Sequence, residues 1–402
     1  MSVLKGKKIL LGISGGIAAY KTASLVRLFI KAGAHVQVIM TPASIDFVTP
    51  LTLSTLSKNP VYSSFYNDDI NAVWNNHVEL GLWADLMIVA PATANTISKM
   101  VNGNCDNLLI ATYLSAKCPV YFAPAMDLDM YIHPSTVENF KALESFENTI
   151  ISAENGELAS GLSGEGRMAE PENIIAFIEN DLNRKLPLRN KKILITAGPT
   201  YEAIDPVRFI GNHSSGKMGF DIANCAANFG AVVTLVTGPT HCQIQNLGIN
   251  LIKVTSANEM FDACHQYFEH SDVMIASAAV ADYKPKNIYL NKIKKSEQNF
   301  NIELEKTKDI LFSLGELKTN QYLIGFALET ENEIENAKLK IQKKNLDLII
   351  LNSLNDKGAG FGTATNKITF IDKYFNMETH DLKTKEQVAL DIINKIIHHY
   401  DS

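Results

Sequence analysis

Cysteine, excess positive charge and long apolar runs are all scarce in this 402-residue sequence. Its five cysteines form no C-x-x-C pair and no metal-binding spacing. An odd, scattered set of this kind is typical of a reducing compartment, so we expect a cytoplasmic protein. The net charge of -6 argues against a general nucleic-acid binder, and no apolar run approaches the length of a membrane span. The length and the apolar fraction of 46% favour a soluble α/β protein with two domains.

Two glycine turns organise the sequence, at residues 7–16 and 191–200, and each follows an apolar strand. Further apolar strands follow both turns in the same order, at residues 33–42, 85–94, 230–239 and 272–281. Strands that are apolar on both faces belong to parallel sheets covered by helices, and glycine turns at their carboxyl ends bind phosphate-bearing ligands. We therefore expect an α/β fold of two Rossmann-like domains, each a mostly parallel sheet with helices on both faces. A polar stretch with a proline separates them, which predicts domains at residues 1–187 and 188–402.

The first turn lacks the G-x-G-x-x-G fingerprint of dinucleotide-binding folds and the acid that accompanies it. The strand that follows ends in Thr41, whose hydroxyl suits a mononucleotide phosphate or a ribityl chain. A tight turn without a ligand is the alternative for this motif alone. Further along lie His77, the pair Met126 and Met130, and a loop at residues 156–168 with four glycines. Taken singly, such histidines and methionines usually pack in a core, but their order and spacing here are not generic.

The second turn precedes Asn212-His213-Ser214-Ser215-Gly216-Lys217-Met218-Gly219. This segment places small hydroxyls and backbone N–H groups before a helix expected at residues 220–228, as a phosphate site requires, but it is not a Walker A loop. Asp282 ends a buried strand, which is a usual position for a Mg2+ ligand beside a nucleotide. Residues 284–308 contain seven lysines, of which we expect most to be solvated and one or two to reach the phosphates.

Together these motifs resemble those of a known family. The N-terminal half is similar to the homo-oligomeric flavin-containing cysteine decarboxylases. The whole sequence resembles the bifunctional coenzyme A biosynthesis enzymes, which join phosphopantothenoylcysteine decarboxylase to phosphopantothenate–cysteine ligase. The resemblance implies CTP-dependent ligation of 4'-phosphopantothenate with cysteine through an acyl-cytidylate. FMN-dependent decarboxylation of 4'-phosphopantothenoylcysteine to 4'-phosphopantetheine would follow.

In the N-terminal half, the resemblance implies an FMN site, an essential histidine at His77 and a substrate site beneath the glycine-rich flap. Flavin would supply the electron sink for decarboxylation by accepting a hydride from the thiol-bearing carbon and later returning it. The implied FMN-binding residues are Ser14, Gly15, Gly16, Ile17, Thr41, Thr93, Ala94, Asn95 and Thr96. The implied substrate-binding residues are Met126, Met130, Arg167 and Met168.

Two catalytic positions of this half depart from the family pattern. Asp127 stands where the family has an asparagine that holds the substrate carboxylate. An ionised aspartate would repel that carboxylate unless it is protonated, turned away, or bridged by a cation or by His77. Ser160 replaces a flap cysteine that protonates the enethiol, and a hydroxyl is a poorer acid than a thiol with a pKa of about 8.5. Our hypothesis is that activity persists with a relocated proton donor; an impaired or regulatory flavin-binding domain is the alternative.

In the C-terminal half, the resemblance implies that Asn212 supports the acyl-nucleotide by donating to its carbonyl oxygen, and that Lys292 is required. Asp282 would also hold Mg2+. The implied nucleotide-binding residues are Ser214, Ser215, Ala278, Ala279, Asp282, Lys292, Lys306, Asp309, Ile310, Phe326, Lys340 and Lys344. Lys340 and Lys344 are four residues apart, so we expect them on one face of a helix at residues 331–344.

Two other functions are open at this point. One is a dehydrogenase with two dinucleotide domains, although the sequence lacks both the fingerprint and the ribose-binding acid. The other is a binding protein that regulates phosphatases, although its relatives carry acidic tails that this sequence lacks. The family resemblance also implies trimers of decarboxylase domains that build a dodecamer, and dimers of ligase domains. We expect small-molecule substrates and no nucleic-acid or membrane partner.

Overall fold

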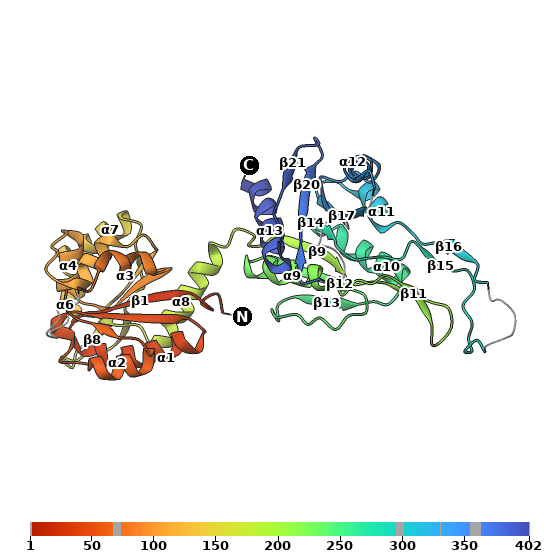
Figure 1. Ribbon diagram of the computed structural model, residues 1–402. Coiled ribbons are helices and arrows are strands. Elements are labelled where there is room, and N and C mark those ends of the chain that lie inside the picture. The colour runs from red at the N-terminus through yellow and green to blue at the C-terminus, as the bar shows by residue number, and fades with distance from the viewer. Residues whose placement is uncertain (1, 67–73, 295–300, 330, 354–362, 402) are drawn as a thin grey trace. The chain divides into compact units, whose positions relative to one another are not determined.

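The computed structural model describes residues 2–66, 74–294, 301–329, 331–353 and 363–401. The chain forms two compact units, Met1–Arg184 and Lys185–Ser402 (Figure 1). Each unit is built on a twisted sheet with helices on both faces, so the predicted α/β architecture is confirmed.

A six-stranded, entirely parallel sheet forms the first unit, in the order β3-β2-β1-β4-β5-β6. Its strands are β1 (Lys8–Ile13), β2 (His35–Met40), β3 (Val61–Tyr62), β4 (Leu86–Ala92), β5 (Val120–Pro124) and β6 (Thr149–Ile150). The strand order reverses between β1 and β4, and such a switch point places a ligand crevice at the carboxyl ends of these strands.

Helices cover both faces of this sheet. The single-turn and α-helical elements are η1 (Ile17–Lys21), α1 (Thr22–Lys31), η2 (Pro42–Ser44), α2 (Pro50–Ser57), α3 (His77–Trp83), α4 (Ala94–Val101), α5 (Leu108–Ser115), α6 (Leu128–Ile132), α7 (Pro134–Ser145) and α8 (Pro171–Arg184). Successive side chains of β1 enter different cores: Ile9 and Leu11 pack with α1, α2 and α8, whereas Leu10 packs with α4, α5 and α7. This alternation explains why the strand is apolar at every position.

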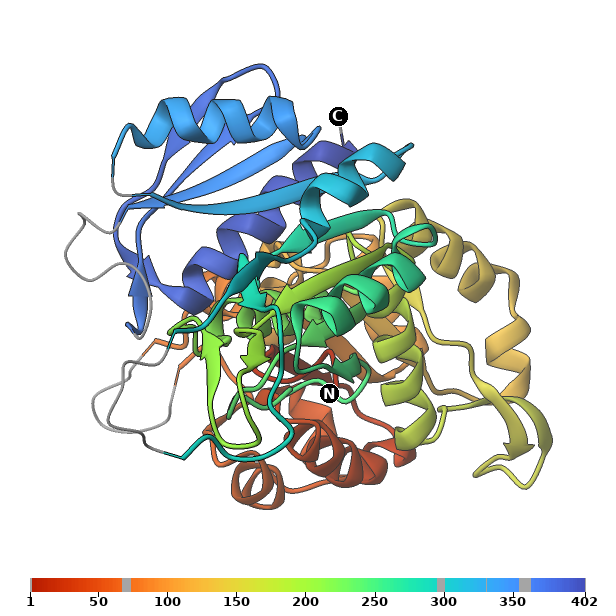
Figure 2. The same ribbon diagram turned by 90° about the vertical axis from the view of Figure 1, so that its right-hand side faces the viewer.

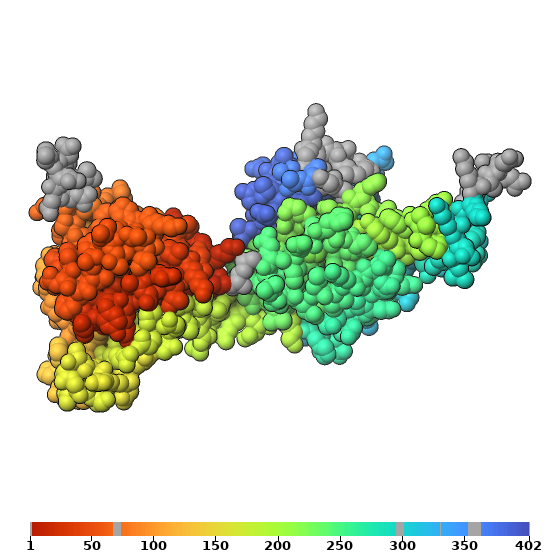
Figure 3. Space-filling view, turned by 90° about the horizontal axis from the view of Figure 1, so that it is seen from below, coloured from red at the N-terminus to blue at the C-terminus, as the bar shows by residue number. Residues whose placement is uncertain are grey.

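The predicted glycine-rich loop forms a hairpin of β7 (Glu154–Glu157) and β8 (Ser163–Arg167). The hairpin extends from the body of the first unit, in yellow in the space-filling view (Figures 2 and 3). Met130, which is expected to bind substrate, lies in the short helix α6.

An eight-stranded sheet forms the second unit, in the order β13-β12-β9-β14-β17-β18-β20-β21. Its strands are β9 (Lys192–Ala197), β12 (Val232–Thr237), β13 (Asn250–Lys253), β14 (Val273–Ala276), β17 (Tyr322–Glu329), β18 (Leu348–Ser353), β20 (Ile368–Asp372) and β21 (Met377–Thr379). The strands from β13 to β18 are parallel, and β20 and β21 are antiparallel. Three short ribbons pair β10 (Tyr201–Ala203) with β11 (Phe209–Gly211), β15 (Tyr283–Pro285) with β16 (Leu304–Lys306), and β19 (Thr365–Asn366) with β22 (Lys383–Thr384).

The helices of the second unit are α9 (Lys217–Asn228), α10 (Ala257–Phe268), α11 (Ile310–Leu317), α12 (Glu333–Lys343) and α13 (Lys385–Asp401). The helices α9 and α13 pack on one face of the sheet and α10, α11 and α12 on the other. The start predicted for α9 was three residues late, because Gly216 adopts a left-handed φ of 82° and allows the helix to begin at Lys217.

Candidate functional sites

A cavity of about 500 Å³ lies at the carboxyl ends of the strands in the first unit. It is lined by residues of the turns that follow β1, β2, β4 and β5. Of the residues predicted from sequence, the cavity wall includes Gly15, Thr41, Thr93, Ala94, Asn95, Thr96, Met126 and Met130. Sequence reasoning missed Pro42, Ala43, Lys99, Asp106, Asn107 and Ala125 on the same wall. The sheet therefore brings together segments that are far apart in the chain.

Ser14 shapes this cavity from behind its wall. Its buried hydroxyl donates a 2.6 Å hydrogen bond to the Pro91 carbonyl and accepts one of 3.0 Å from the Thr93 amide. These bonds hold the turn after β1 against the segment that starts α4. At Gly15, an added Cβ would lie 2.8 Å from the backbone of Ala43, so only glycine permits this approach of the two turns. Ser14 and Gly15 therefore both maintain the shape of the cavity, a role that the binding motif alone does not reveal.

Thr41 carries the buried polar atom that most clearly indicates a ligand-binding position. Its Oγ1 atom is buried and has no hydrogen-bond partner among the described residues. A buried hydroxyl without a partner costs free energy, and a phosphate or ribityl oxygen in the adjoining cavity would satisfy it. The eight-residue helix α4 begins at the same wall with Ala94 and Asn95, and helix N-termini favour anions. The donor set and the cavity therefore fit a flavin mononucleotide.

Several residues predicted for this site lie elsewhere among the described residues. Gly16 and Ile17 are not on the cavity wall, and Ile17 is 60% exposed. His77, the first residue of α3, packs edge-on against Phe65 and Trp74 with ring centroids 6.3 Å apart in each pair. Its buried Nδ1 atom has no partner within the described parts of the chain. A single copy therefore does not bring the imidazole to the cavity.

The root of the hairpin is tied to the segment that contains Asp127. The Met126 amide donates a 3.0 Å hydrogen bond to the Gly166 carbonyl. Gly166 has φ +141°, and a Cβ added there would lie 2.4 Å from the Met126 carbonyl oxygen. Asp127 caps α6 by accepting a 2.7 Å hydrogen bond from the Leu128 amide. Its carboxylate is thus fixed beside Met126 but is not on the described cavity wall, and Ser160 is exposed at the hairpin tip.

Arg167 and Met168 connect this hairpin to the core. Glu170 accepts hydrogen bonds from Arg167 and, at 3.0 Å, from the buried Lys21, which also donates a 2.8 Å bond to the Met168 carbonyl. The Lys21 hydrogen bond and the nearby charges hold the pKa of Glu170 below its usual range. The Met168 side chain is 1% exposed and packs in the core, away from the cavity wall.

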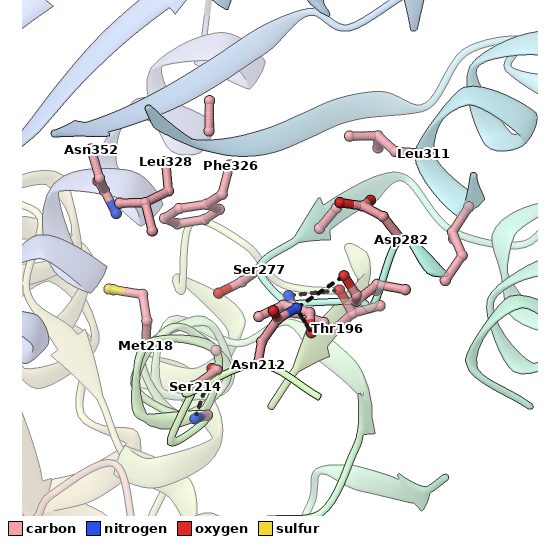
Figure 4. Close-up of a pocket in the computed structure, with 18 of the residues that line it drawn as sticks. Thr196, Asn212, Ser214, Met218, Ser277, Asp282, Leu311, Phe326, Leu328 and Asn352 are labelled. Atoms are coloured by element: carbon pink, nitrogen blue, oxygen red, sulfur yellow. Dashed lines mark hydrogen bonds between the residues drawn. The ribbon is translucent and has the colours of Figure 1, made fainter. Parts of the chain in front are cut away.

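A larger cavity, of about 680 Å³, lies at the carboxyl ends of the strands in the second unit (Figure 4). Most of the residues predicted from sequence line it, namely Asn212, Ser214, Ser215, Ala278, Ala279, Asp282, Lys306, Asp309, Ile310, Phe326 and Lys344. The polar residues that sequence reasoning missed are Thr196, Lys217, Ser277, Tyr283, Thr307, Lys308, Asn352, Asn366 and Lys385. Of these, Thr196, Lys217, Ser277, Thr307 and Lys308 lie inside segments that the sequence had already distinguished.

Asn212 holds the loop that follows β14. Its Nδ2 atom donates to the carbonyls of Ala279 at 3.0 Å and Val280 at 3.1 Å, and Figure 4 shows the side chain at the centre of the cavity. Ser214 and Ser215 accept weak bonds of 3.3 and 3.4 Å from the amides two residues further on. These contacts place hydroxyls and backbone N–H groups at the start of α9.

The predicted nucleotide-binding lysines separate in the structure. Lys344, directly after α12, pairs with Asp309 at 2.8 Å and lines the cavity. Burial raises the pKa of Asp309, but the Lys344 hydrogen bond and charge outweigh it, so the pKa is lowered. Lys340 instead pairs with Glu329 at 2.6 Å and is not on the described cavity wall. Lys292 is exposed and away from that wall, and its neighbour Lys295 lies outside the described residues.

Neither a preformed metal cluster nor a membrane span is found in the described parts of the chain. No group of three or more histidine, cysteine or acidic residues there could hold a metal ion. No described helix combines the length and apolar character needed to cross a bilayer. Asp282, exposed on the wall of the second cavity, offers oxygen ligands of the kind that Mg2+ shares with nucleotide phosphates.

Two family models together match nearly the whole chain. One is described as Flavoprotein and matches residues 2–183; the other is the DNA/pantothenate metabolism flavoprotein C-terminal domain and matches residues 188–400. A Coenzyme A biosynthesis bifunctional protein CoaBC from Bacillus subtilis is 42% identical over 98% of this chain and 97% of its own. A CoaBC protein from Vibrio cholerae is 44% identical over 98% of this chain and 99% of its own.

A Cysteine/Cysteine sulfinic acid decarboxylase from an unknown prokaryotic organism is 52% identical over 87% of this chain and 99% of its own. Among solved structures, the C-terminal domain of a CoaBC protein is 42% identical, with a TM-score of 0.47, over 54% of this chain and 99% of its own.

Proposed function

Because the chain belongs to the family of the coenzyme A biosynthesis bifunctional proteins, CoaBC, we propose that it carries out two consecutive reactions of coenzyme A synthesis. Residues 188–402 would join 4'-phosphopantothenate to cysteine at the expense of CTP. Residues 1–187 would then decarboxylate 4'-phosphopantothenoylcysteine with FMN. The observation that carries this proposal is the pair of separate cavities, one per unit, each at the carboxyl ends of a parallel sheet.

In the ligase reaction, the phosphopantothenate carboxylate attacks the α-phosphorus of CTP, and pyrophosphate leaves with the electron pair of the broken bond. The cysteine amine then attacks the acyl carbon, and cytidine monophosphate leaves. Asp282 would hold Mg2+ beside the reacting phosphate, and Lys344 beside Asp309 would bind the nucleoside end. Asn212 would exchange one of its bonds to Ala279 or Val280 for the acyl oxygen as that carbon becomes tetrahedral.

In the decarboxylation, bound FMN would supply a reversible hydride acceptor. The residues of the chain itself would bind the cofactor and enclose the substrate. Thr41 and the start of α4 would hold the phosphate and ribityl groups, and the hairpin would cover the substrate beside Asp127. Ser160 stands at the hairpin tip in place of the usual cysteine, so the proton would come from a relocated donor. Since His77 lies away from the cavity of its own copy, we propose that it serves a neighbouring copy in an oligomer of trimers.

Assays of single variants test whether each unit carries out one of the two reactions. We expect Asn212→Ala to slow CTP-dependent formation of 4'-phosphopantothenoylcysteine by at least tenfold, since removing one oxyanion-stabilising donor costs about 100-fold or more in comparable enzymes. The same variant should decarboxylate supplied 4'-phosphopantothenoylcysteine at the normal rate. Equal loss of both activities would contradict the assignment of the reactions to separate units.

A second substrate for the first unit is favoured by Asp127 and by the relative that decarboxylates cysteine. A free amino acid carries an α-ammonium group, which the acylated substrate lacks, and a carboxylate at this position would attract it. Carbon dioxide release should be compared for cysteine, cysteine sulfinic acid and 4'-phosphopantothenoylcysteine. If the protein prefers either free amino acid, decarboxylation of that amino acid replaces the second reaction proposed above. If it prefers the acylated substrate, the proposed second reaction stands.

A further inference from the structure

One end of the second cavity is lined by lysines from the first turns of two neighbouring helices. Lys217 is the first residue of α9, and Lys385 is the first residue of α13. These helices pack against each other on one face of the sheet (Figure 1). Lys385 is only 5% exposed although it carries an ammonium group, so the fold places a charge where solvation is poor.

Two asparagines belong to the same end of the cavity. Asn352 lies on β18 and pairs in register with Ile368, and Asn366 lies on β19, whose partner strand β22 leads directly into Lys385. The Asn352 Oδ1 atom is buried and has no partner among the described residues. Asn366 is 2% exposed. The Nδ2 groups of these asparagines and the two ammonium groups are hydrogen-bond donors that suit a ligand with several oxygen atoms, whereas the Asn352 Oδ1 atom accepts and requires a donor.

This polar end lies opposite the proposed nucleoside end. In the view of Figure 4, Asn352 and Met218 lie on one side of the cavity and Asp282 and Leu311 on the other, with Asn212 between them. A nucleotide with its base near Leu311 and its reacting phosphate near Asn212 would direct its remaining phosphates toward α9 and α13. The positive N-terminal ends of both helices favour anions there.

Charges of both signs surround Lys385. Lys217 pairs with Asp221 at 2.9 Å and lies 3.7 Å from the exposed Glu386. Burial lowers the pKa of Lys385, while the charge of Asp221 opposes this shift and that of Lys217 adds to it. Cys242 also lies near enough to act on Lys385, and its effect opposes the lowering of the pKa. A phosphate group in the cavity would favour the charged form of both lysines.

We propose that Lys385, together with Lys217, binds the β and γ phosphates of the nucleotide. The inference rests on the proposed ligase function and adds a phosphate-binding residue from the C-terminal helix. When the substrate carboxylate bonds to the α-phosphorus, the bond to the bridging oxygen breaks and its electron pair goes to pyrophosphate. The two ammonium groups neutralise the charge that develops on this leaving group.

The test compares nucleotides with and without these phosphates. CTP and CMP are titrated calorimetrically into the full-length protein and its Lys385→Met, Lys385→Arg and Lys395→Met variants. Lys395 is the matched control, since it lies on the same helix but pairs with Glu378 at 2.7 Å outside the cavity. We expect Lys385→Met to weaken CTP binding at least tenfold and to leave CMP binding within twofold, because only CTP loses a charge-assisted hydrogen bond to its β or γ phosphate. Lys385→Arg should retain most of the CTP affinity.

Equal weakening of CTP and CMP, or no weakening of either, would overturn the proposal. So would a normal nucleotide affinity combined with a raised KM for phosphopantothenate or cysteine. Inorganic pyrophosphate gives a test that needs no variant: it should displace CTP but not CMP from the wild-type protein, and displacement of CMP would contradict the assignment. Failure of the wild-type protein to bind CTP or ATP would instead overturn the ligase function itself.

Discussion

Gly166 lies where the hairpin of the first unit contacts the segment that contains Met126 and Asp127. The substitution Gly166→Ala perturbs this contact most directly. The added Cβ would lie 2.4 Å from the Met126 carbonyl oxygen and must move by about 1 Å to reach the 3.4 Å of ordinary contact. The residue also has φ +141°, a conformation that costs a side chain about 1–3 kcal/mol. The neighbouring hydrogen bond between Met126 and Gly166 is worth about another 1 kcal/mol.

Gly161→Ala is the matched control for this substitution. Gly161 also has a positive φ, of +82°, but nothing lies within 4 Å of its added Cβ. Both variants strain the backbone, and only Gly166→Ala displaces the hairpin from the segment that contains Asp127. A displacement of about 1 Å can cost about 100-fold in rate, so we expect at least a tenfold loss of decarboxylation in Gly166→Ala beyond that in Gly161→Ala.

The assay measures carbon dioxide release from 4'-phosphopantothenoylcysteine, and CTP-dependent pyrophosphate release serves as the internal control. Pyrophosphate release should stay within twofold of the wild-type rate in both variants, because the substitutions lie in the other unit. Equal decarboxylation rates in the two variants would refute the inferred role of the hairpin joint.

Three further perturbations address the same unit. Thr41→Val should weaken FMN binding about threefold to tenfold in a flavin fluorescence titration, because one hydrogen bond is lost, yet leave the melting temperature of the apoprotein unchanged or raised; a destabilised apoprotein would contradict this. Ser160→Cys should raise the decarboxylation rate at least tenfold by restoring a thiol acid, and an unchanged rate would exclude the hairpin tip as the source of the proton. Since the folded-state pKa of Glu170 is depressed, its contribution to stability is present above the usual value of about 4.5 and is lost as pH falls through the folded pKa. In the Glu170→Gln variant, the free energy of unfolding should therefore fall less steeply between about pH 5 and 3 than in the wild-type protein. An unchanged slope of unfolding free energy against pH would argue against the bond with Lys21.

The sequence was sufficient to predict the sheets and the location of the cavities. Both follow from apolar strands that end in glycine or hydroxyl residues, because neighbouring parallel strands bring their carboxyl ends to one edge. Thr41 and Thr93, on turns after different strands, meet in one cavity for this reason. Asn212 and Asp282 meet in the other cavity in the same way.

Residues that act through tertiary packing could not be predicted in this way. Lys385 reaches the cavity only because α13 packs on α9, and no local pattern indicates that contact. Met168 belongs to a binding motif, yet its side chain fills the core. Lys340 was grouped with Lys344 by helical spacing, but the carboxylate of Glu329 binds it away from the cavity wall. Spacing along a helix indicates a shared face and does not indicate which partner each side chain finds.

The central claim is that one chain carries out two successive reactions, and a coupled assay tests it directly. The wild-type protein, loaded with FMN, is supplied with 4'-phosphopantothenate, cysteine, CTP and Mg2+, and the products are followed by mass. We predict 4'-phosphopantetheine, with one pyrophosphate and one carbon dioxide released for each molecule formed. Accumulation of 4'-phosphopantothenoylcysteine without carbon dioxide release would contradict the claim.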